Sequence, residues 1–466
     1  MFTEQTQLKR ELFGDDFIWG VAASAFQYEG AHDVDGKQHS IWDSFSSLKN
    51  KIHNEATANV ACDFYNRYET DIQLLSKLNI PHFRYSVAWS RILPNGVGAI
   101  NQKGIDFYNR VIDVLLEQSI TPWFTLYHWD LPHALQQKGG WTNREIINWF
   151  NEYALVCATK FGDRVKNWMV LNEPMAIAGA GYFLGVHAPG KKGLQNFLPA
   201  AHHLVLCQST AAKTLKQNIS NGNIGTTFSC SHISSHTNSL KDLMAANRVD
   251  VLLNRMFIEP ALGLGYPMKA LPMLKRMENY IKQGDEQLMQ HDFDFIGLQN
   301  YTREVVKHSY LTPFINAALI PAQKRNVECT AMNWEVYPKA IYNLLKQFSE
   351  YKNIPQLIIT ENGAAFNDTL INNKIYDDRR ILYLQEHLRE ILKAKQEGVN
   401  VQGYFVWSYL DNFEWTEGYR PRFGLVYVDF ENQKRIVKNS GKWFAEFLEK
   451  NKMIEKQAKQ FSNTAI

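Results

Sequence analysis

Residues 167–174 read NWMVLNEP, and residues 356–363 read QLIITENG. Each segment is a short apolar run, typical of a strand, and each ends with a glutamate beside an asparagine. Six further apolar runs occur along the chain, and amphipathic helical patterns separate them. We predict eight strands, at residues 17–22, 82–87, 122–127, 167–172, 223–228, 293–299, 356–361 and 402–408.

The helical patterns between the strands include residues 59–77, 104–117, 143–160, 198–217 and 377–395. Regular alternation of strands and helices predicts parallel strand pairing with the helices outside. Eight such units favour an α/β fold, a single (β/α)8 TIM barrel. The additional length is assigned to elaborated βα-loops, with candidates at residues 27–58, 182–193 and 301–334.

The chain shows no internal boundary. No Pro-, Gly- or Ser-rich linker divides it, and no close repeat occurs in it. Residues 1–466 are therefore predicted to form a single barrel domain, with its core at about 14–450. The tail after Glu449 is polar and rich in Lys, and it is expected to fray.

The composition excludes several classes of partner. The 50 Lys and Arg residues against 47 Asp and Glu residues give a formal net charge of +3. No dense Lys/Arg stripe of the kind that binds phosphate backbones occurs, so nucleic acid is not an expected partner. No run of about 18 apolar residues occurs, so no membrane span is expected.

The five cysteines are odd in number and widely spaced, at Cys62, Cys157, Cys207, Cys230 and Cys329. This pattern favours reduced thiols, and the absence of Cys-x-x-Cys spacing argues against a zinc site. The N-terminal residues contain no apolar segment typical of a signal peptide. The sequence therefore predicts a cytoplasmic protein.

Aromatic residues make up 13% of the chain, with 12 Trp and 21 Tyr. Their rings offer flat apolar faces with polar edges, which suit the apolar faces and polar rims of sugar rings. The same residues also fill large cores, so composition alone leaves both interpretations open.

In a barrel of the predicted kind, functional side chains lie at the C-terminal ends of the strands. Here those ends carry carboxylates, amides and aromatic rings, and a purely structural barrel does not need polar residues at most of them. The residues are Gln27, Arg84, His128, Trp129, Asn172, Glu173, Tyr301, Glu361 and Trp407.

Glu173 and Glu361 supply two carboxyl groups, from the fourth and seventh predicted strands. Cleavage of a glycosidic bond needs one carboxyl group to protonate the departing oxygen and another to attack or stabilise the anomeric carbon. Taken alone, Asn-Glu-Pro also fits a helix start, and Glu-Asn-Gly also fits a turn. Their joint placement favours the catalytic interpretation. Because two carboxyl groups suffice, no metal and no organic cofactor are expected.

Five long motifs occur along the chain. They are FIWGVAASAFQYEG at 17–30, HWDLP at 128–132, the Asn-Glu-Pro motif, TENG at 360–363 and WSYLDNFEW at 407–415. In these motifs and in their order, the chain resembles family 1 of the glycoside hydrolases from about Phe17 to Phe447.

The resemblance implies a retaining mechanism of double displacement. Glu361 matches the nucleophile, and Glu173 matches the residue that first protonates the leaving oxygen and then activates water. Their carboxyl groups are then expected about 5–5.5 Å apart. Arg84 matches the arginine beside the nucleophile, and Tyr301 matches the tyrosine that donates to it. Arg84 also fits a structural ion pair, and both interpretations hold together.

The resemblance also implies a set of substrate-binding residues. Those matched to the glycone site are Gln27, His128, Trp129, Asn172, Glu414 and Trp415. Trp407 matches the platform under the sugar, and Trp334 matches the platform for the leaving group. Taken singly, His128 also fits a core histidine and Trp407 a core side chain, so the assignment rests on the set.

Two residues indicate the branch of the family. In the phospho-glycosidases a hydroxyl residue stands at the position of Glu414, and a carboxylate there would repel a phosphate. Unphosphorylated sugars are therefore expected. In the thioglucoside-cleaving branch a glutamine replaces the acid, whereas this chain has Glu173.

One position departs from the family pattern. The family usually has Gly-Leu-Asn-Tyr-Tyr after the sixth strand, and this chain has Gly297-Leu298-Gln299-Asn300-Tyr301. Counting from Gly297 places Gln299 at the asparagine and makes it a further candidate substrate-binding residue. A shifted register would make Asn300 the functional amide instead.

The first hypothesis is a retaining β-glucosidase that acts on a small-molecule β-glucoside or oligosaccharide. The alternatives are a broad β-galactosidase or β-fucosidase, a transglycosidase and a non-catalytic sugar-binding barrel. A phosphate-binding barrel is disfavoured, because no Gly-rich phosphate loop follows the last two strands. The sequence leaves the oligomeric state open, including a homo-oligomer.

Overall fold

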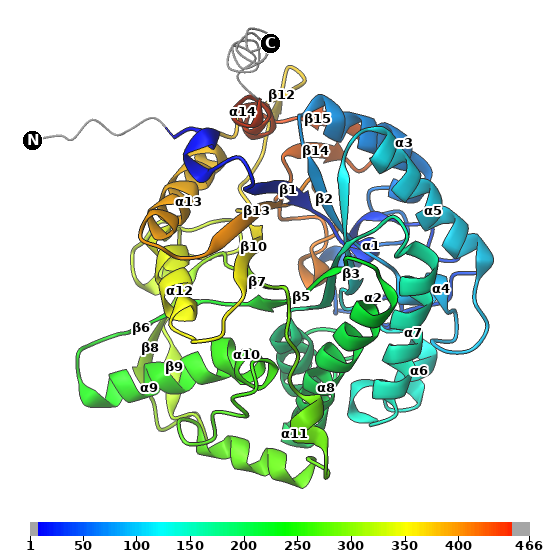
Figure 1. The fold of residues 1–466 in the computed structure, drawn as a ribbon. Coiled ribbons are helices and arrows are strands. Elements are labelled where there is room, and N and C mark those ends of the chain that lie inside the picture. The colour runs from blue at the N-terminus through cyan, green and yellow to red at the C-terminus, as the bar shows by residue number, and fades with distance from the viewer. Residues whose placement is uncertain (1–7, 450–466) are drawn as a thin grey trace, which may run out of the picture.

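The computed structural model describes residues 8–449, and a ring of eight parallel strands lies at its centre (Figure 1). The strands close in the order β1-β13-β10-β7-β5-β4-β3-β2, which confirms the predicted (β/α)8 TIM barrel. Their bounds are β1 (Ile18–Ala22), β2 (His82–Ser86), β3 (Thr121–Tyr127), β4 (Asn167–Asn172), β5 (Asn223–Ser229), β7 (Phe295–Gln299), β10 (Gln356–Asn362) and β13 (Val401–Trp407). Each overlaps one predicted strand.

The barrel interior is filled with side chains. Trp123 lies at its centre, with its ring centroid 5.5 Å from that of Phe295 and 5.3 Å from that of Phe405. Met169 and Ile358 are fully buried in the same cluster. The strands are apolar on both faces because this interior and the surrounding helices cover them. A cavity can therefore open only at an end of the barrel.

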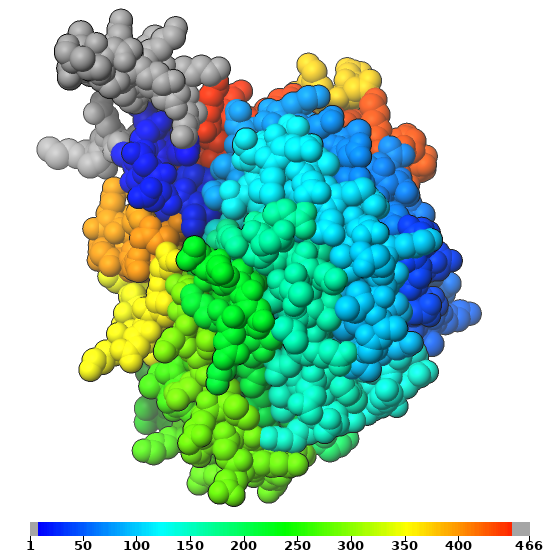
Figure 2. All heavy atoms as spheres, turned by 45° about the vertical axis from the view of Figure 1, so that its right-hand side comes forward, coloured from blue at the N-terminus to red at the C-terminus, as the bar shows by residue number. Residues whose placement is uncertain are grey.

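Helices cover the outside of the barrel, and on the face in Figure 2 the cyan and teal segments form a continuous outer layer. The helices are α1 (Ala25–Tyr28), α2 (Ile41–Ser46), α3 (Phe64–Lys77), α4 (Trp89–Ile92), α5 (Gln102–Glu117), α6 (His133–Gln137), α7 (Ile146–Phe161), α8 (Leu194–Asn218), α9 (Leu240–Asp250), α10 (Met256–Ala261), α11 (Asp285–Leu288), α12 (Lys339–Ser349), α13 (Asp378–Gln396) and α14 (Asn439–Leu448). The helix predicted at 59–77 begins later, at Phe64, because Ala61 and Asp63 have positive φ angles of 50° and 54°.

The βα-loops contain structure that the sequence patterns did not indicate. Within 301–334, β8 (Arg303–His308) is the middle strand of a three-stranded sheet, in which it pairs with β6 (His232–Ser235) and with β9 (Ala317–Leu319). Two hairpins follow, formed by β11 (Leu370–Ile371) with β12 (Lys374–Ile375) and by β14 (Val426–Asp429) with β15 (Lys434–Val437). These strands have two to six residues, too few to give a periodic signal.

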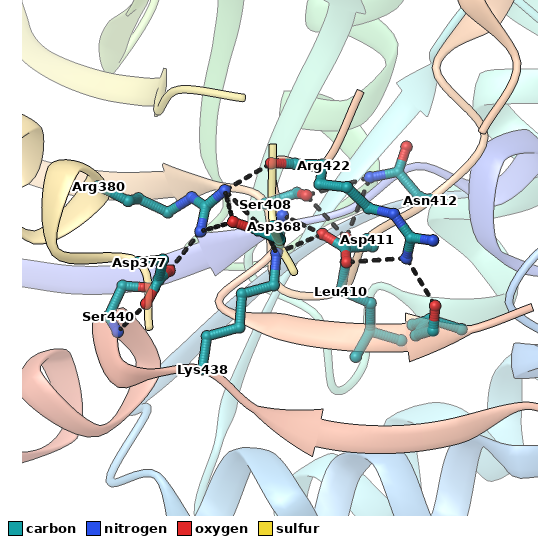
Figure 3. Close-up of polar contacts among 12 residues, drawn as sticks. Asp368, Asp377, Arg380, Ser408, Leu410, Asp411, Asn412, Arg422, Lys438 and Ser440 are labelled. Carbon is teal, nitrogen blue, oxygen red and sulfur yellow. Dashed lines mark hydrogen bonds and ion pairs between the residues drawn. The ribbon is translucent and has the colours of Figure 1, made fainter. Parts of the chain in front are cut away.

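A buried ion network fixes the loop that follows β13 (Figure 3). Lys438 Nζ lies 2.6 Å from Asp411 Oδ1 and also pairs with Asp368. Arg380 Nη2 lies 3.0 Å from Asp368 Oδ2, and Arg422 Nη1 lies 3.1 Å from Asp411 Oδ2. With Asp377, which pairs with Arg380, the network holds three carboxylates and three cations. The loop after β13 is thereby tied to the segment after β10, to α13 and to the start of α14.

Within residues 8–449, no helix is both long enough and apolar enough to cross a membrane. The polar tail predicted to fray after Glu449 lies outside the described residues.

Candidate active site

A cavity of about 410 Å³ opens at the C-terminal ends of the barrel strands and contains both Glu173 and Glu361 in its lining. Seven other sequence-predicted residues also line it, namely His128, Trp129, Tyr301, Trp334, Trp407, Glu414 and Trp415. Three predicted residues, Arg84, Asn172 and Gln299, lie fully buried and form hydrogen bonds with lining residues. Gln27 is also fully buried and donates to Asn412 and Phe413, next to the lining residue Glu414 in the chain. The structure thus brings all of the predicted side chains together.

Glu361 ends β10 among hydrogen-bond donors. The Arg84 guanidinium donates to Glu361 Oε1, and the Tyr301 hydroxyl donates to Oε2 at 2.6 Å. Burial raises the pKa of Glu361, and the charge of Arg84 and the Tyr301 hydrogen bond oppose that rise. These donors favour the ionised form, which is the form that a nucleophile needs.

Glu173 follows β4 in a different environment. Burial, and then the negative charge of Glu361, raise the pKa of Glu173 to about 8. This carboxyl group therefore keeps its proton at neutral pH and can act as an acid. The backbone of Glu173 has a φ of 52°, and its N–H donates to Thr227 O at 3.0 Å. A left-handed glutamate is uncommon and is found where the surroundings impose it.

Asn172 links several of the buried polar groups. Its Oδ1 accepts from Arg84 Nη2 and, at 3.2 Å, from Thr227 Oγ1. Its Nδ2 lies 3.0 Å from His128 Nε2, and its backbone carbonyl accepts from Trp129 Nε1 at 2.9 Å. Burial, with the nearby charge of Arg84, lowers the pKa of His128 well below its usual range, so the ring is neutral. Since Nε2 accepts from Asn172, the proton lies on Nδ1, which has no partner among residues 8–449.

Indole rings form flat walls of the cavity. The ring centroids of Trp129 and Trp415 lie 4.5 Å apart, and Trp407 lies 5.9 Å from His128. On another part of the wall, Trp334 lies 5.3 Å from Tyr301. Such faces suit the apolar C–H surfaces of sugar rings.

Glu414 adds a third carboxyl group to the lining. Burial, and then the charge of Glu361, raise the pKa of Glu414 to about 8. Its Oε2 has no hydrogen-bond donor among the described residues, so it is open to a ligand hydroxyl.

Gln27 holds the loop that carries Glu414 and Trp415. Its Nε2 donates to Asn412 Oδ1 at 3.0 Å and to Phe413 O at 2.9 Å. Its Oε1 accepts from the Ser24 hydroxyl at 2.6 Å. The side chain therefore connects the end of β1 to the loop after β13.

The structure distinguishes Gln299 from its neighbour Asn300. Gln299 Nε2 lies 2.9 Å from Glu361 Oε1, whereas Asn300 Nδ2 donates to the carbonyls of Cys230 and Thr302. The amide that contacts Glu361 is therefore Gln299, in the register counted from Gly297.

Several lining residues had not been predicted from the sequence. Ser229 is the last residue of β5, and Cys230 and Ser231 follow it, at a strand end for which no charged or aromatic residue drew attention. The other lining residues that were missed are His187, Thr302, Glu304, Met332, Thr416, Glu417 and Phe423. Only the position of strand five could have pointed to the first group, because all barrel strand ends meet at one rim.

The closed barrel, with a donor-bound carboxylate and a protonated carboxyl group in one cavity, has the architecture of a barrel glycosidase. The family model for glycosyl hydrolase family 1 matches residues 9–453, and the chain belongs to that family.

Similar proteins come from several organisms. Beta-glucosidase A of Thermotoga maritima is 44% identical over 443 residues, which cover 94% of this chain and 98% of that protein. The 1,4-beta-D-glucan glucohydrolase of Thermotoga neapolitana is 42% identical over 445 residues, with 95% and 99% covered. A solved structure, a beta-glucosidase from Thermotoga maritima in complex with glucoimidazole, superimposes with a TM-score of 0.89 at 44% identity over 93% of this chain and 98% of that one.

Proposed function

We propose that this enzyme is a retaining β-glucosidase that removes terminal non-reducing β-D-glucosyl residues from unphosphorylated β-glucosides or cello-oligosaccharides. The observation that carries the proposal is the contrast between its two carboxyl groups. Arg84 and Tyr301 donate to Glu361, while burial and the charge of Glu361 raise the pKa of Glu173 to about 8. A nucleophile and an acid need this division of protonation states.

In the first step Glu361 attacks the anomeric carbon, and the bond to the leaving oxygen breaks as Glu173 gives that oxygen its proton. A glycosyl-enzyme ester remains, and Glu173 is then a carboxylate. In the second step Glu173 removes a proton from water, the water oxygen bonds to the anomeric carbon, and Glu361 leaves as a carboxylate. Two inversions at the same carbon retain the β configuration. A carboxyl separation of about 5–5.5 Å stays the expected geometry for this mechanism.

The substrate assignment rests on the lining of the cavity and on the relatives. Glu414 offers an unpartnered oxygen to sugar hydroxyls, and the described residues that line the cavity include no Lys or Arg to bind a phosphate group. The name of the Thermotoga neapolitana relative, 1,4-beta-D-glucan glucohydrolase, supports oligosaccharides as substrates. Gln27, His128, Trp129, Asn172, Glu414 and Trp415 would bind the glycone, while Trp407 and Trp334 would be the platforms for the sugar and the leaving group.

We also propose that the chain acts as one catalytic domain in the cytoplasm. The five cysteines are free thiols, and four of them are buried, which is consistent with a reducing compartment.

The proposal is tested by incubating the wild-type enzyme with the nitrophenyl β-glycosides of glucose, galactose, fucose and 6-phosphoglucose. We expect the glucoside to have the highest kcat/KM and the 6-phosphoglucoside the lowest. Proton NMR should show β-glucose as the first-formed product, before mutarotation. A first product in the α configuration would contradict the retaining mechanism. No turnover of any of the four would favour the sugar-binding barrel.

The pH profile of kcat/KM for cellobiose should fall on the basic side as pH rises through about 8. The reason is that Glu173 must carry its proton in the first step, and its pKa is raised to about 8. Below that pH the acid is present, and above it the acid is lost.

The pKa of Glu414 is also raised to about 8, so its titration could also cause the basic limb, the fall of kcat/KM at high pH. Two variants distinguish Glu414 from Glu173. Glu414→Gln should keep the limb for cellobiose. Glu173→Ala, assayed with the 2,4-dinitrophenyl glucoside, should lose it, because that leaving group needs no acid. A limb that disappears in Glu414→Gln would assign the titration to Glu414 instead.

A further inference from the structure

Gln299 lies fully buried at the end of β7, between the side chains of Glu361 and Asn172. Its Nε2 is 2.9 Å from Glu361 Oε1 and 2.6 Å from Asn172 Oδ1. Both of these oxygens are acceptors, so the amide must present its two N–H donors to them. Gln299 is not among the residues that line the cavity.

The strand register explains why a glutamine makes both contacts. Glu361 on β10 lies directly beside Gln299, whereas Asn172 belongs to β4 on the far side of β5. To reach Asn172, the side chain passes Thr227 of β5, whose Oγ1 is 3.3 Å from Nε2. The family's usual asparagine is one methylene shorter.

Arg84 makes the same bridge from the other side. Its two terminal nitrogens donate to Glu361 Oε1 and Asn172 Oδ1, the same two oxygens that accept from Gln299. The four side chains therefore form a closed ring of hydrogen bonds from β2, β10, β7 and β4. Oε1 of Glu361 receives donors from this ring, and Oε2 receives the Tyr301 hydroxyl.

We propose that Gln299 is a positioning residue that locks the Glu361 carboxylate in the ring and holds it ionised, and that it does not bind the sugar. The inference rests on the proposed role of Glu361 as the nucleophile. Hydrogen-bond donors on both oxygens restrict the rotation of a carboxylate and favour its ionised form. An ionised carboxylate in a fixed orientation is prepared to attack the anomeric carbon.

The competing assignment is the substrate contact predicted from the sequence. Gln299 Oε1 is buried and has no donor among residues 8–449, so a sugar hydroxyl could donate to it. The two roles differ in one measurable respect. A positioning residue acts on Glu361 whatever the sugar, whereas a sugar ligand acts only through one hydroxyl.

The test compares two variants of Gln299. Gln299→Met keeps the length of the side chain and removes its amide, whereas Gln299→Asn keeps the amide on a side chain that is one methylene too short to contact both Glu361 and Asn172. Thr227→Val serves as the matched control, because Thr227 Oγ1 contacts Asn172 and Gln299 and makes no hydrogen bond to Glu361 among the described residues. For each enzyme, kcat/KM is measured against pH with nitrophenyl β-glucoside and with its monodeoxy analogues. Thermal unfolding checks the fold of each variant.

We expect Gln299→Met to lower kcat/KM on the order of tenfold or more, because the ionised form of Glu361 loses a hydrogen-bond donor. For the same reason the acid limb of the profile, where kcat/KM falls at low pH as Glu361 takes up a proton, should move to higher pH by about one unit. Gln299→Asn should move the limb less. Thr227→Val should leave it in place. The loss caused by Gln299→Met should be the same for the glucoside and for every deoxy analogue.

The proposal is overturned if the acid limb stays in place, or if the loss disappears with one deoxy analogue, which would make Gln299 a ligand of that hydroxyl. If Gln299→Met does not fold, the position of the acid limb in Gln299→Asn decides whether Gln299 positions Glu361 or binds the sugar. Failure of the proposed function would appear separately, as an inactive wild type or an active Glu361→Ala variant.

Discussion

Replacing Glu361 with alanine is expected to lower the hydrolysis of nitrophenyl β-glucoside on the order of 10⁴-fold or more. Without the carboxylate no bond to the anomeric carbon can form, and the Arg84 charge beneath the site loses its counter-ion. Sodium azide should restore turnover, because the anion fits the space left by the carboxylate. A single displacement then gives the α-glucosyl azide.

Glu304→Ala is the matched control for this variant. Glu304 lines the same cavity, and within the described residues its side chain makes no ion pair or hydrogen bond. We expect it to change kcat/KM far less than Glu361→Ala does. Appreciable activity in Glu361→Ala without azide, or a β-glucosyl azide product, would contradict the assignment of Glu361.

Replacing Glu173 with alanine should produce an effect that depends on the leaving group. Hydrolysis of cellobiose should fall on the order of 10²- to 10⁴-fold, because without a proton donor the sugar must leave as an alkoxide, which is a poor leaving group. With 2,4-dinitrophenyl β-glucoside the first step should proceed at nearly the wild-type rate. The glycosyl-enzyme then accumulates, since no base activates water for the second step.

Azide should accelerate that second step in Glu173→Ala, because an anion needs no base, and the product should be the β-glucosyl azide. The opposite anomers from the two alanine variants separate the nucleophile from the acid. An α-glucosyl azide from Glu173→Ala would exchange the two assignments. An equal loss with both substrates would indicate that Glu173 is not the acid.

The barrel could be predicted because its signal is local and repeated. Each of the eight strands is a short apolar run, and most of them are followed by polar or aromatic residues that fit the rim of a barrel. Because the C-terminal ends of all barrel strands meet at one rim, residues as distant in sequence as Gln27 and Trp415 could be assigned to one site. Their roles came from motif resemblance and stay proposals.

The features that escaped prediction depend on contacts between distant segments. Nothing near Glu173 in the sequence indicates its left-handed backbone, whose N–H donates to the Thr227 carbonyl of β5. Ser229 and Ser231 line the cavity through their position alone, since serine is common in loops. The pairing of Lys438 with Asp368 and Asp411 joins residues 70 and 27 positions apart, and no local pattern encodes it.

The ion network behind the loop after β13 has a consequence for how such an enzyme can diverge. Substituting one member alone leaves a buried charge without a partner and lowers the free energy of unfolding by about 3–5 kcal/mol. That loss is a large part of the total stability of a typical protein. Lys438 and Asp411 are each fully buried, so they can change only in compensating pairs. The ion network thus restricts substitution in the loop that carries Glu414 and Trp415. The lining residues Ser229, Ser231 and Thr302 carry small uncharged groups that can be exchanged singly. New substrate preferences should therefore arise at these positions first.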